Sequence, residues 1–375
     1  MDAPLVQSLS TSQGPRRARR LWVTLAVIGT LAHLIACFET PRDSGDLGKR
    51  VLTAVMANAE GWHVLGRSVS DWAPALAQRV SWGEVPYNYP PLALAFFQVV
   101  AWLHPSLFAA KFALTLLEAL NAVLIARFAK DRRAGIAYWC LPLSIWWVSH
   151  EGAMEPLQNL FVLLALLAWQ QRRGFAPGAL LLAVQVKLSA VFLAPWLFWT
   201  SPRPRKLTGW MKAGAFTAAA LSPAIVASLC YPMAAQVGYI FHSTVKFNVY
   251  HWRAAFDASY HWWLPEIFVI WVQVASWATL LEIGRQMVRA PAPALLWTGA
   301  FLFLVAARFM TVFQPWYFLA FIPLWLPAVS ARQRLAWFVL VQFCEPQSVW
   351  QLLFGPSGPM SPHGGLPLFL RLAHP

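Results

Sequence analysis

The sequence predicts an all-α protein, a polytopic bundle of transmembrane helices with its N-terminus in the cytoplasm. Of its 375 residues, 58% are hydrophobic and only 12% are Asp, Glu, Lys or Arg, whereas soluble domains carry about a quarter of their residues as charges. The stretch 21–38 contains no charged residue, and similar apolar runs recur along the chain, as expected for spans of roughly 20 residues. The 22 Trp and 28 Pro residues are typical of interfacial anchors and interrupted membrane helices. This composition excludes a soluble globular enzyme, a disordered chain and a disulfide scaffold.

The order of the expected elements follows from these runs. Residues 1–20 are polar and end in a cluster of Arg, which predicts a cytoplasmic tail. The run 21–38 is interpreted as the first span, because no small-residue cleavage site of a signal peptide follows it. We expect a single transmembrane domain over 21–354, external loops at 39–89 and 232–262, and a Pro/Gly-rich tail at 355–375. The further apolar runs lie at about 90–104, 107–127, 134–149, 156–170, 175–200, 210–231, 263–283, 294–309, 314–330 and 335–354.

The Lys and Arg residues lie in short clusters between these runs, which is the pattern of cytoplasmic loops. The net charge of +14 therefore indicates membrane topology, and no nucleic-acid partner is expected. Strict alternation of all eleven runs would place the basic clusters at 127–133 and 172–173 outside. If run 90–104 and run 175–200 do not cross, every basic cluster lies inside. Both arrangements stay open, so the prediction is about 9–11 membrane segments.

Two features single out the runs that need not cross. Run 90–104 is short and opens with Pro90 and Pro91. Run 175–200 is long and carries Lys187 at its centre, which favours a broken helix or a pair of half-helices. If neither run crosses the membrane, four polar-rich segments lie together on the outer face. These segments are 39–89, 150–156, 232–262 and 313–317.

No metal site or cofactor is expected from the sequence. The four Cys residues are scattered singly without a Cys-x-x-Cys pair, so they are interpreted as small core residues. His150 and Glu151 begin the pattern His-Glu-x-x-His of zinc proteases, but Met154 stands where the second His would be. A bound divalent cation is left open.

Asp43 and Asp46 directly follow the first predicted span, three residues apart. A carboxylate fixed at the membrane surface is suited to act as a general base on an incoming hydroxyl group. The alternative is a helix N-cap, since Asp46 precedes Lys49 and Arg50 in a stretch around 49–66 that we expect to be helical.

Several short motifs follow this Asp in a fixed order. Asp46-Leu47 is followed after about 40 residues by Tyr87-Asn88-Tyr89-Pro90-Pro91-Leu92, then by Gly152 to Asn159 and by Arg172-Arg173-Gly174 with Gly178 and Lys187. Gln314-Pro315-Trp316-Tyr317 lies late in the chain. This order resembles the GT-C superfamily of membrane glycosyltransferases, and most closely the polyprenyl-phosphate-mannose-dependent α-mannosyltransferases of bacteria.

The resemblance implies an inverting transfer of a sugar, mannose by family likeness, from a polyprenyl-phosphate donor to a hydroxyl of a lipid or glycan acceptor. The reaction would take place at the outer face of a multi-pass protein in the bacterial cytoplasmic membrane, in contact with membrane lipids. Asp46 matches the catalytic Asp of the family's first loop, and Asp43 is the second candidate. The sequence departs from the family at Gly48-Lys49-Arg50-Val51, where the family usually has a Tyr.

The departing phosphate needs cations and the sugar needs polar contacts. Arg253 and Arg308 are the favoured phosphate ligands, because a guanidinium binds phosphate with two parallel hydrogen bonds. Lys187 either binds a phosphate or pairs within the bundle, and Glu155 with Pro156 either contacts sugar or begins a helix. The expected substrate-binding residues are Glu84, Tyr87, Tyr89, His150, Glu151, Glu155, Lys187, Arg253, Arg308, Trp316 and Tyr317.

Two other functions compete with this reading. A lipid or small-molecule transporter or flippase would show internal symmetry and several charges within the spans, where the sequence offers Lys187 and Glu118. A non-catalytic relative of the glycosyltransferases would explain the departure after Asp46-Leu47.

Overall fold

The computed structural model of the protein describes residues 14–39, 45–80, 83–87, 89–171, 174–193, 207–230 and 319. These residues form helices and their connections, and the one strand-like feature among them is an isolated antiparallel bridge between Ser68 and Pro86. The predicted all-α class is therefore confirmed for the described part of the chain. The expected loop 232–262, the tail 355–375 and the four apolar runs from 263 onwards lie outside the described residues, apart from Leu319.

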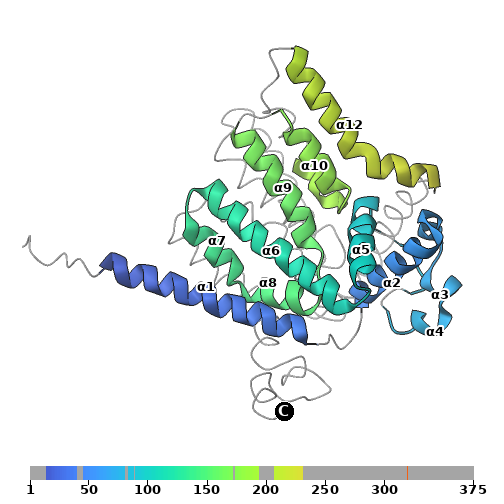
Figure 1. The fold of residues 1–375 in the computed structure, drawn as a ribbon, viewed down its shortest axis with the longest axis horizontal. Coiled ribbons are helices and arrows are strands. Elements are labelled where there is room, and N and C mark those ends of the chain that lie inside the picture. The colour runs from blue at the N-terminus through green and yellow to red at the C-terminus, as the bar shows by residue number, and fades with distance from the viewer. Residues whose placement is uncertain are drawn as a thin grey trace, which may run out of the picture.

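Six helices form a row of neighbours across the bundle (Figure 1). In spatial order they are α1 (Gly14–Phe38), α7 (Arg132–Trp139), α6 (Leu107–Ala129), α9 (Glu155–Gln170), α10 (Ala176–Val184) and α12 (Leu207–Cys230). Helices α1 and α7 pack against one side of α6, and α9 packs against the other side. The start of α6 contacts the end of α1, since the rings of Phe108 and Phe38 stack with centroids 5.1 Å apart. Helices α1 and α6 are therefore antiparallel.

A second group of helices covers the N-terminal end of α6. Helices α2 (Gly45–Glu60) and α5 (Pro91–Leu103) pack on each other and on α6, as Figure 1 shows. The short elements η1 (Trp62–Gly66), α3 (Val69–Trp72) and α4 (Pro74–Ala77) connect them. The expected external loop is thus largely helical, and α5, with 13 residues, is shorter than the roughly 20 residues that a full crossing needs.

Three of the described helices are long and apolar enough to cross a membrane: Arg19–Phe38, Leu107–Ala129 and Leu207–Cys230. They correspond to the expected spans 21–38, 107–127 and 210–231. The first helix begins at Gly14, so it takes in the end of the stretch 1–20 that we expected to be a polar tail.

The apolar run 134–149 does not form one continuous helix. Helix α7 ends after eight residues at Trp139, and the chain continues after Leu141 as α8 (Pro142–Ser144) and the π-helix η2 (Ile145–His150). Pro142 causes the break, because it lacks an N–H group and disfavours the helical conformation of the residue before it. The segments Pro142–His150 and Glu155–Gln170 meet at 119°, and by length and composition the pair fits a broken span or a re-entrant segment.

The expected break in run 175–200 is confirmed. Helix α10 ends at Val184 after nine residues, and the 3-10 helix η3 (Leu188–Leu193) follows it. Lys187 lies in the irregular stretch between the two. The sequence indicated this break, since a charged residue stands in the middle of an apolar run.

Polar side chains inside the bundle are joined to one another. Glu118 of α6 is fully buried, and its carboxylate accepts hydrogen bonds from the Tyr138 hydroxyl (2.7 Å) and the Ser144 hydroxyl (2.5 Å). The amide of Asn159 in α9 donates to the Tyr138 hydroxyl at 3.4 Å and to the carbonyl of Leu319 at 2.8 Å. Because a buried polar group without a partner is costly, these bonds fix which faces of α6, α7, α8 and α9 meet.

A second polar group joins α1 to α6 and η2. The ring of His33 lies 2.6 Å from the Ser149 hydroxyl and 2.9 Å from the Trp139 carbonyl oxygen. The Ser149 hydroxyl also lies 2.8 Å from that of Thr115, which is 3.1 Å from the Cys37 thiol. Among the described cysteines, Cys37, Cys140 and Cys230 form no disulfide.

Helices α6 and α7 are packed so closely at Gly135 that no side chain fits. A Cβ atom there would lie 2.3 Å from the Ala122 carbonyl oxygen, a backbone atom that cannot move without shifting α6. Gly135→Ala should therefore destabilise the protein by about 1–3 kcal/mol. Gly214→Ala in α12 is the matched control, because a Cβ there meets nothing within 4 Å and a helical Gly→Ala change gains about 0.5–1 kcal/mol.

Thermal unfolding of both variants in detergent, followed by Trp fluorescence, checks this expectation. The midpoint should fall for Gly135→Ala and stay or rise for Gly214→Ala. Equal midpoints for the two variants would contradict the close packing of α6 on α7.

Candidate functional site

The candidate site lies where α1 ends, and a lysine from α6 fixes that end. The ammonium group of Lys111 donates to the carbonyl oxygen of Ala36 at 3.2 Å and to that of Glu39. Both carbonyls belong to the end of α1, where the helix leaves its last carbonyls without partners and its dipole favours a cation. Lys111 therefore holds the backbone of Glu39 in a defined position.

His150 lies between two carboxylates at this end of the bundle. Its Nε2 atom is 3.5 Å from an oxygen of Glu39, and its Nδ1 atom is 2.8 Å from an oxygen of Glu151. The ring also stacks on Trp146 with centroids 4.1 Å apart. His150 is the last residue of the π-helix η2, a conformation that is found frequently at functional sites.

Gly152 connects this turn to α2. Its φ is +74° and a Cβ atom there would lie 2.5 Å from the Leu47 side chain, so the position favours glycine for both backbone and space. The carbonyl oxygen of Gly152 accepts a hydrogen bond from Arg50 Nη1 at 3.2 Å. The first turns of α2 therefore lie directly against the turn that follows His150.

Arg50 is the centre of the contacts on the α2 side. The residue is 4% exposed, and its Nη2 atom lies 3.3 Å from Asp46 Oδ2 and 2.8 Å from the Tyr89 hydroxyl oxygen. The guanidinium also lies over the Tyr89 ring, 4.6 Å from its centroid. Burial alone would lower the pKa of Arg50, but the neighbouring Tyr89 and Asp46 outweigh it and raise that pKa above its ordinary value.

Asp46 is held in place and still reaches solvent. It lies in the first turn of α2, where the helix dipole favours a negative charge. Its Oδ2 atom accepts from Arg50 and from the Tyr89 hydroxyl at 3.1 Å, and the side chain is 34% exposed. Asp46 is therefore inside the helix and not the N-cap of the alternative reading, and its carboxylate is accessible to a proton donor.

Three further residues lie beside this carboxylate. Lys49 is buried and donates to the carbonyl oxygen of Pro86 at 3.2 Å. Burial lowers the pKa of Lys49 to about 8, although the nearby charges of Asp46 and Glu84 oppose the change. Tyr87 is buried edge-on to Tyr89, with ring centroids 5.8 Å apart, and its burial raises the pKa of the phenol. Glu84 is exposed.

Glu155 and Lys187 form a separate pair. The ammonium group of Lys187 contacts the buried carboxylate of Glu155, and Glu155 with Pro156 begins α9. The structure therefore shows Lys187 paired within the bundle and Glu155 at the start of a helix, which were the structural alternatives for these two residues. Their expected roles in binding sugar and phosphate stay predictions.

The structure brings together two of the four polar-rich segments, since residues from 39–89 and from 150–156 meet here. Tyr89 contacts Asp46 directly and Tyr87 packs on Tyr89. His150 and Glu151 pair with each other in the turn before Gly152, which reaches Asp46 only through Arg50. The residues Asp43, Arg253, Arg308, Trp316 and Tyr317 lie outside the described part of the chain. Within that part, no group of three or more His, Cys, Asp or Glu side chains is arranged to hold a metal ion.

Sequence reasoning missed Arg50, Glu39 and Lys111 as members of the site. The spacing of Asp46 and Arg50, four residues apart on a helix, was a signal for their ion pair. The sequence indicated Lys111 less clearly. A lysine near the start of an apolar helix is equally well explained by a side chain that extends to the lipid headgroups.

Comparisons of this chain with protein-family models, with curated protein sequences and with solved structures found no match.

The buried contacts of Arg50 predict a large effect on stability. Arg50→Ala would leave Gly152 O and Asp46 without their shared partner, and we expect it to cost about 2–4 kcal/mol. Arg67→Ala is the matched control, because Arg67 pairs with Glu60 while both side chains are more than a third exposed, and such pairs contribute about 0–1 kcal/mol. Thermal unfolding in detergent checks the difference, and a similar shift for both variants would contradict the structural role of Arg50.

Proposed function

We propose that this protein is a membrane glycosyltransferase that moves a sugar from a polyprenyl-phosphate donor to a hydroxyl acceptor, with Asp46 as the general base. The observation that carries the proposal is the carboxylate of Asp46, partly exposed at one end of the bundle and oriented by Arg50 and Tyr89. The order of motifs along the chain supplies the reaction class.

In the proposed step the oxygen of the acceptor hydroxyl attacks the anomeric carbon of the donor. The bond from that carbon to the phosphate oxygen breaks, and polyprenyl phosphate leaves with the bonding electrons. Asp46 takes the proton of the hydroxyl. Attack from the side opposite the phosphate inverts the configuration of the anomeric carbon.

Arg50 is a positioning residue in this proposal. Its guanidinium is buried against Asp46, Tyr89 and the Gly152 carbonyl, so it orients the base and does not face an incoming phosphate. The phosphate ligands of the proposal are Arg253 and Arg308, and Tyr87 to Pro91 shape the entrance for the lipid; both assignments rest on the sequence.

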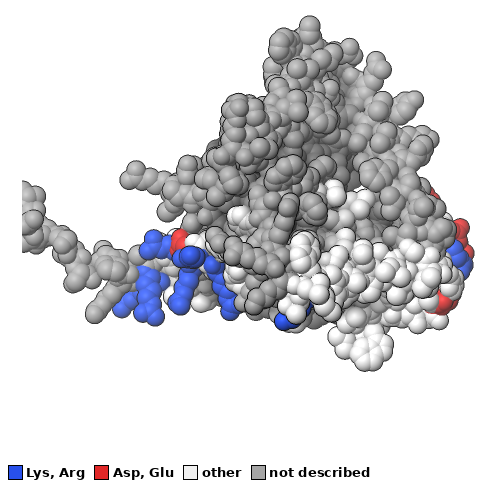
Figure 2. Space-filling view, turned by 90° about the horizontal axis from the view of Figure 1, so that it is seen from above, with Lys and Arg blue, Asp and Glu red and all other residues white. Residues whose placement is uncertain are grey.

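The proposal places the reaction at the outer face of a multi-pass protein in a bacterial cytoplasmic membrane. Three helices long and apolar enough to span a membrane support a membrane location. Lys and Arg gather at the end of the described surface opposite the candidate site (Figure 2), from the start of α1, the end of α6 and the start of α7. Basic residues favour the cytoplasmic side, which supports an outer location for Asp46.

A transporter or flippase is the second candidate. Glu118 and Lys187, the charges within the apolar runs, favour it on sequence alone. In the structure, however, Glu118 accepts hydrogen bonds from Tyr138 and Ser144, and Lys187 pairs with Glu155. These contacts join helices and give the charges a structural role.

The test of the glycosyltransferase uses purified protein, a radiolabelled polyprenyl-phosphate sugar and a membrane lipid extract. Wild-type protein should release polyprenyl phosphate and transfer label to the extract. Asp46→Asn should lower the rate about 100-fold or more, because a general base contributes about 10²–10⁴.

Asp43→Asn and Glu60→Gln accompany this test. Glu60 is exposed and pairs with Arg67, so Glu60→Gln should leave the rate unchanged. Full turnover by Asp46→Asn with loss of turnover by Asp43→Asn would transfer the role of base to Asp43. If neither Asp variant changes the rate, the proposed mechanism is wrong, and movement of intact donor without cleavage would favour the flippase.

The proposed topology has its own test in a variant without the native cysteines. A cysteine at His63, whose side chain is 58% exposed, should react with an impermeant thiol reagent on intact cells. A cysteine at Arg133, which is exposed at the basic end, should react only after the membrane is permeabilised. The reverse pattern would place Asp46 in the cytoplasm.

A further inference from the structure

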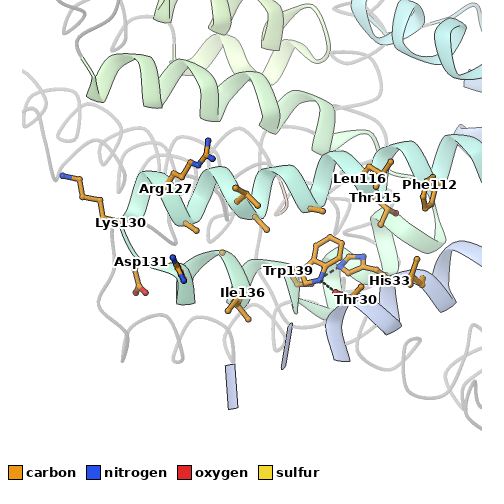
Figure 3. A pocket seen from close by; sticks show the side chains of 17 residues that line it. Thr30, His33, Phe112, Thr115, Leu116, Arg127, Lys130, Asp131, Ile136 and Trp139 are labelled. Atoms are coloured by element: carbon orange, nitrogen blue, oxygen red, sulfur yellow. Dashed lines mark hydrogen bonds between the residues drawn. The ribbon is translucent and has the colours of Figure 1, made fainter. Parts of the chain in front are cut away.

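A groove of about 870 Å³ runs between α1, α6 and α7, away from Asp46. Its volume is within the range of about 300–1,000 Å³ typical of small-molecule sites. Figure 3 shows Arg127 and Lys130 at one end and Phe112, Thr115 and Leu116 at the other. From Thr115 to Lys130 the groove follows about 22 Å of α6 at 1.5 Å per residue, somewhat more than the roughly 15 Å of one membrane leaflet.

The two ends of the groove differ in chemistry. Arg127, Lys130 and Arg132 line the end where α6 meets α7, and all three are exposed. Asp131 is the single carboxylate among the described lining residues, and its Oδ1 atom accepts from the backbone N–H of Arg133 at 3.0 Å as the N-cap of α7. The cationic end therefore attracts an anion.

The backbone at Lys130 supports this reading. Lys130 is the C-cap of α6 with φ +53°, and within the described residues no other non-glycine residue has a positive φ. Glycine is the usual residue in this left-handed conformation. A lysine in this conformation lowers the stability of the fold relative to glycine. It also places an ammonium group at the end of the groove.

The remainder of the groove is mostly apolar, with Thr30, His33 and Thr115 as its polar lining residues. Phe112, Leu116 and Val123 line it from α6, and each is exposed by more than a third. On the α1 side, Leu34 is also exposed. Because α1 and α6 are long and apolar enough to cross a membrane, these exposed apolar side chains are suited to contact acyl chains.

We propose that this groove binds one anionic glycerophospholipid of the cytoplasmic leaflet. The phosphate of the headgroup contacts Arg127, Lys130 and Arg132, and one acyl chain lies along α6 toward Thr115. Basic pockets between membrane helices on this side are suited to lipid phosphates. The site is separate from the proposed sugar chemistry and does not depend on it.

Native mass spectrometry of the full-length protein in nonionic detergent tests the proposal, with phosphatidylglycerol and phosphatidylcholine added in turn. Wild-type protein should bind phosphatidylglycerol at least fivefold more tightly. The triple variant Arg127→Gln, Lys130→Gln, Arg132→Gln should bind phosphatidylglycerol at least tenfold more weakly, since each cation contributes about fivefold. The double variant Arg19→Gln, Arg20→Gln is the control: both residues are exposed basic residues of α1 outside the groove lining, and it should bind like wild type.

Two single variants separate binding from folding. Lys130→Gly suits the left-handed backbone, so its unfolding midpoint should be unchanged or higher while its affinity for phosphatidylglycerol falls about fivefold. Ala119→Trp keeps every cation but fills the groove between Leu116 and Val123, and it should weaken both lipids.

Three results would overturn the proposal. One is equal affinity of wild-type protein for the two lipids, and a second is wild-type affinity in the triple variant. The third is displacement of bound phosphatidylglycerol by millimolar inorganic phosphate, which would identify a site for free anions that needs no acyl chain.

Discussion

The end of the bundle that carries Asp46 depends on how the guanidinium of Arg50 is satisfied. An Arg that is almost fully buried needs partners for its donors. Here the two terminal nitrogens find them at Asp46, Tyr89 and the carbonyl of Gly152, whereas Nε has no hydrogen-bond partner among the described residues. These partners belong to a helix, to the segment before α5 and to the turn after η2. One side chain therefore sets the relative positions of three segments that are far apart in the sequence, and the direction of the Asp46 carboxylate follows from them.

The same requirement organises the interior. In an apolar bundle, each buried polar group adds a constraint on which helices can meet, because water is not there to replace a missing partner. Glu118 restricts the approach of α7 and α8 to α6, and His33 restricts the approach of α1 to η2. The carboxylates of Asp46, Glu39 and Glu151 differ from these, because each stays partly exposed while it contacts a cation or an imidazole.

Hydropathy predicted the long helices α1, α6 and α12, since a run of apolar residues is sufficient to indicate them. It failed at Pro142, because a hydropathy window records composition and does not register the loss of a backbone N–H in an apolar run. At the site, the position of Asp46 after the first span was enough to select it. The partner Tyr89 is 43 residues away, and the contact of Arg50 with Gly152 spans 102 residues, so neither contact has a local pattern in the sequence.

The π-helix η2 has a consequence for how this chain tolerates insertions and deletions. A π turn holds one residue more than an α turn, so deletion of one residue within Ile145–His150 would leave an ordinary α-helix. Every later residue of that segment would then rotate by about 100° around the axis. His150 would leave its place between Glu39 and Glu151, and Ser149 would leave His33. The extra residue of the π-helix therefore sets the directions in which the Ser149 and His150 side chains point.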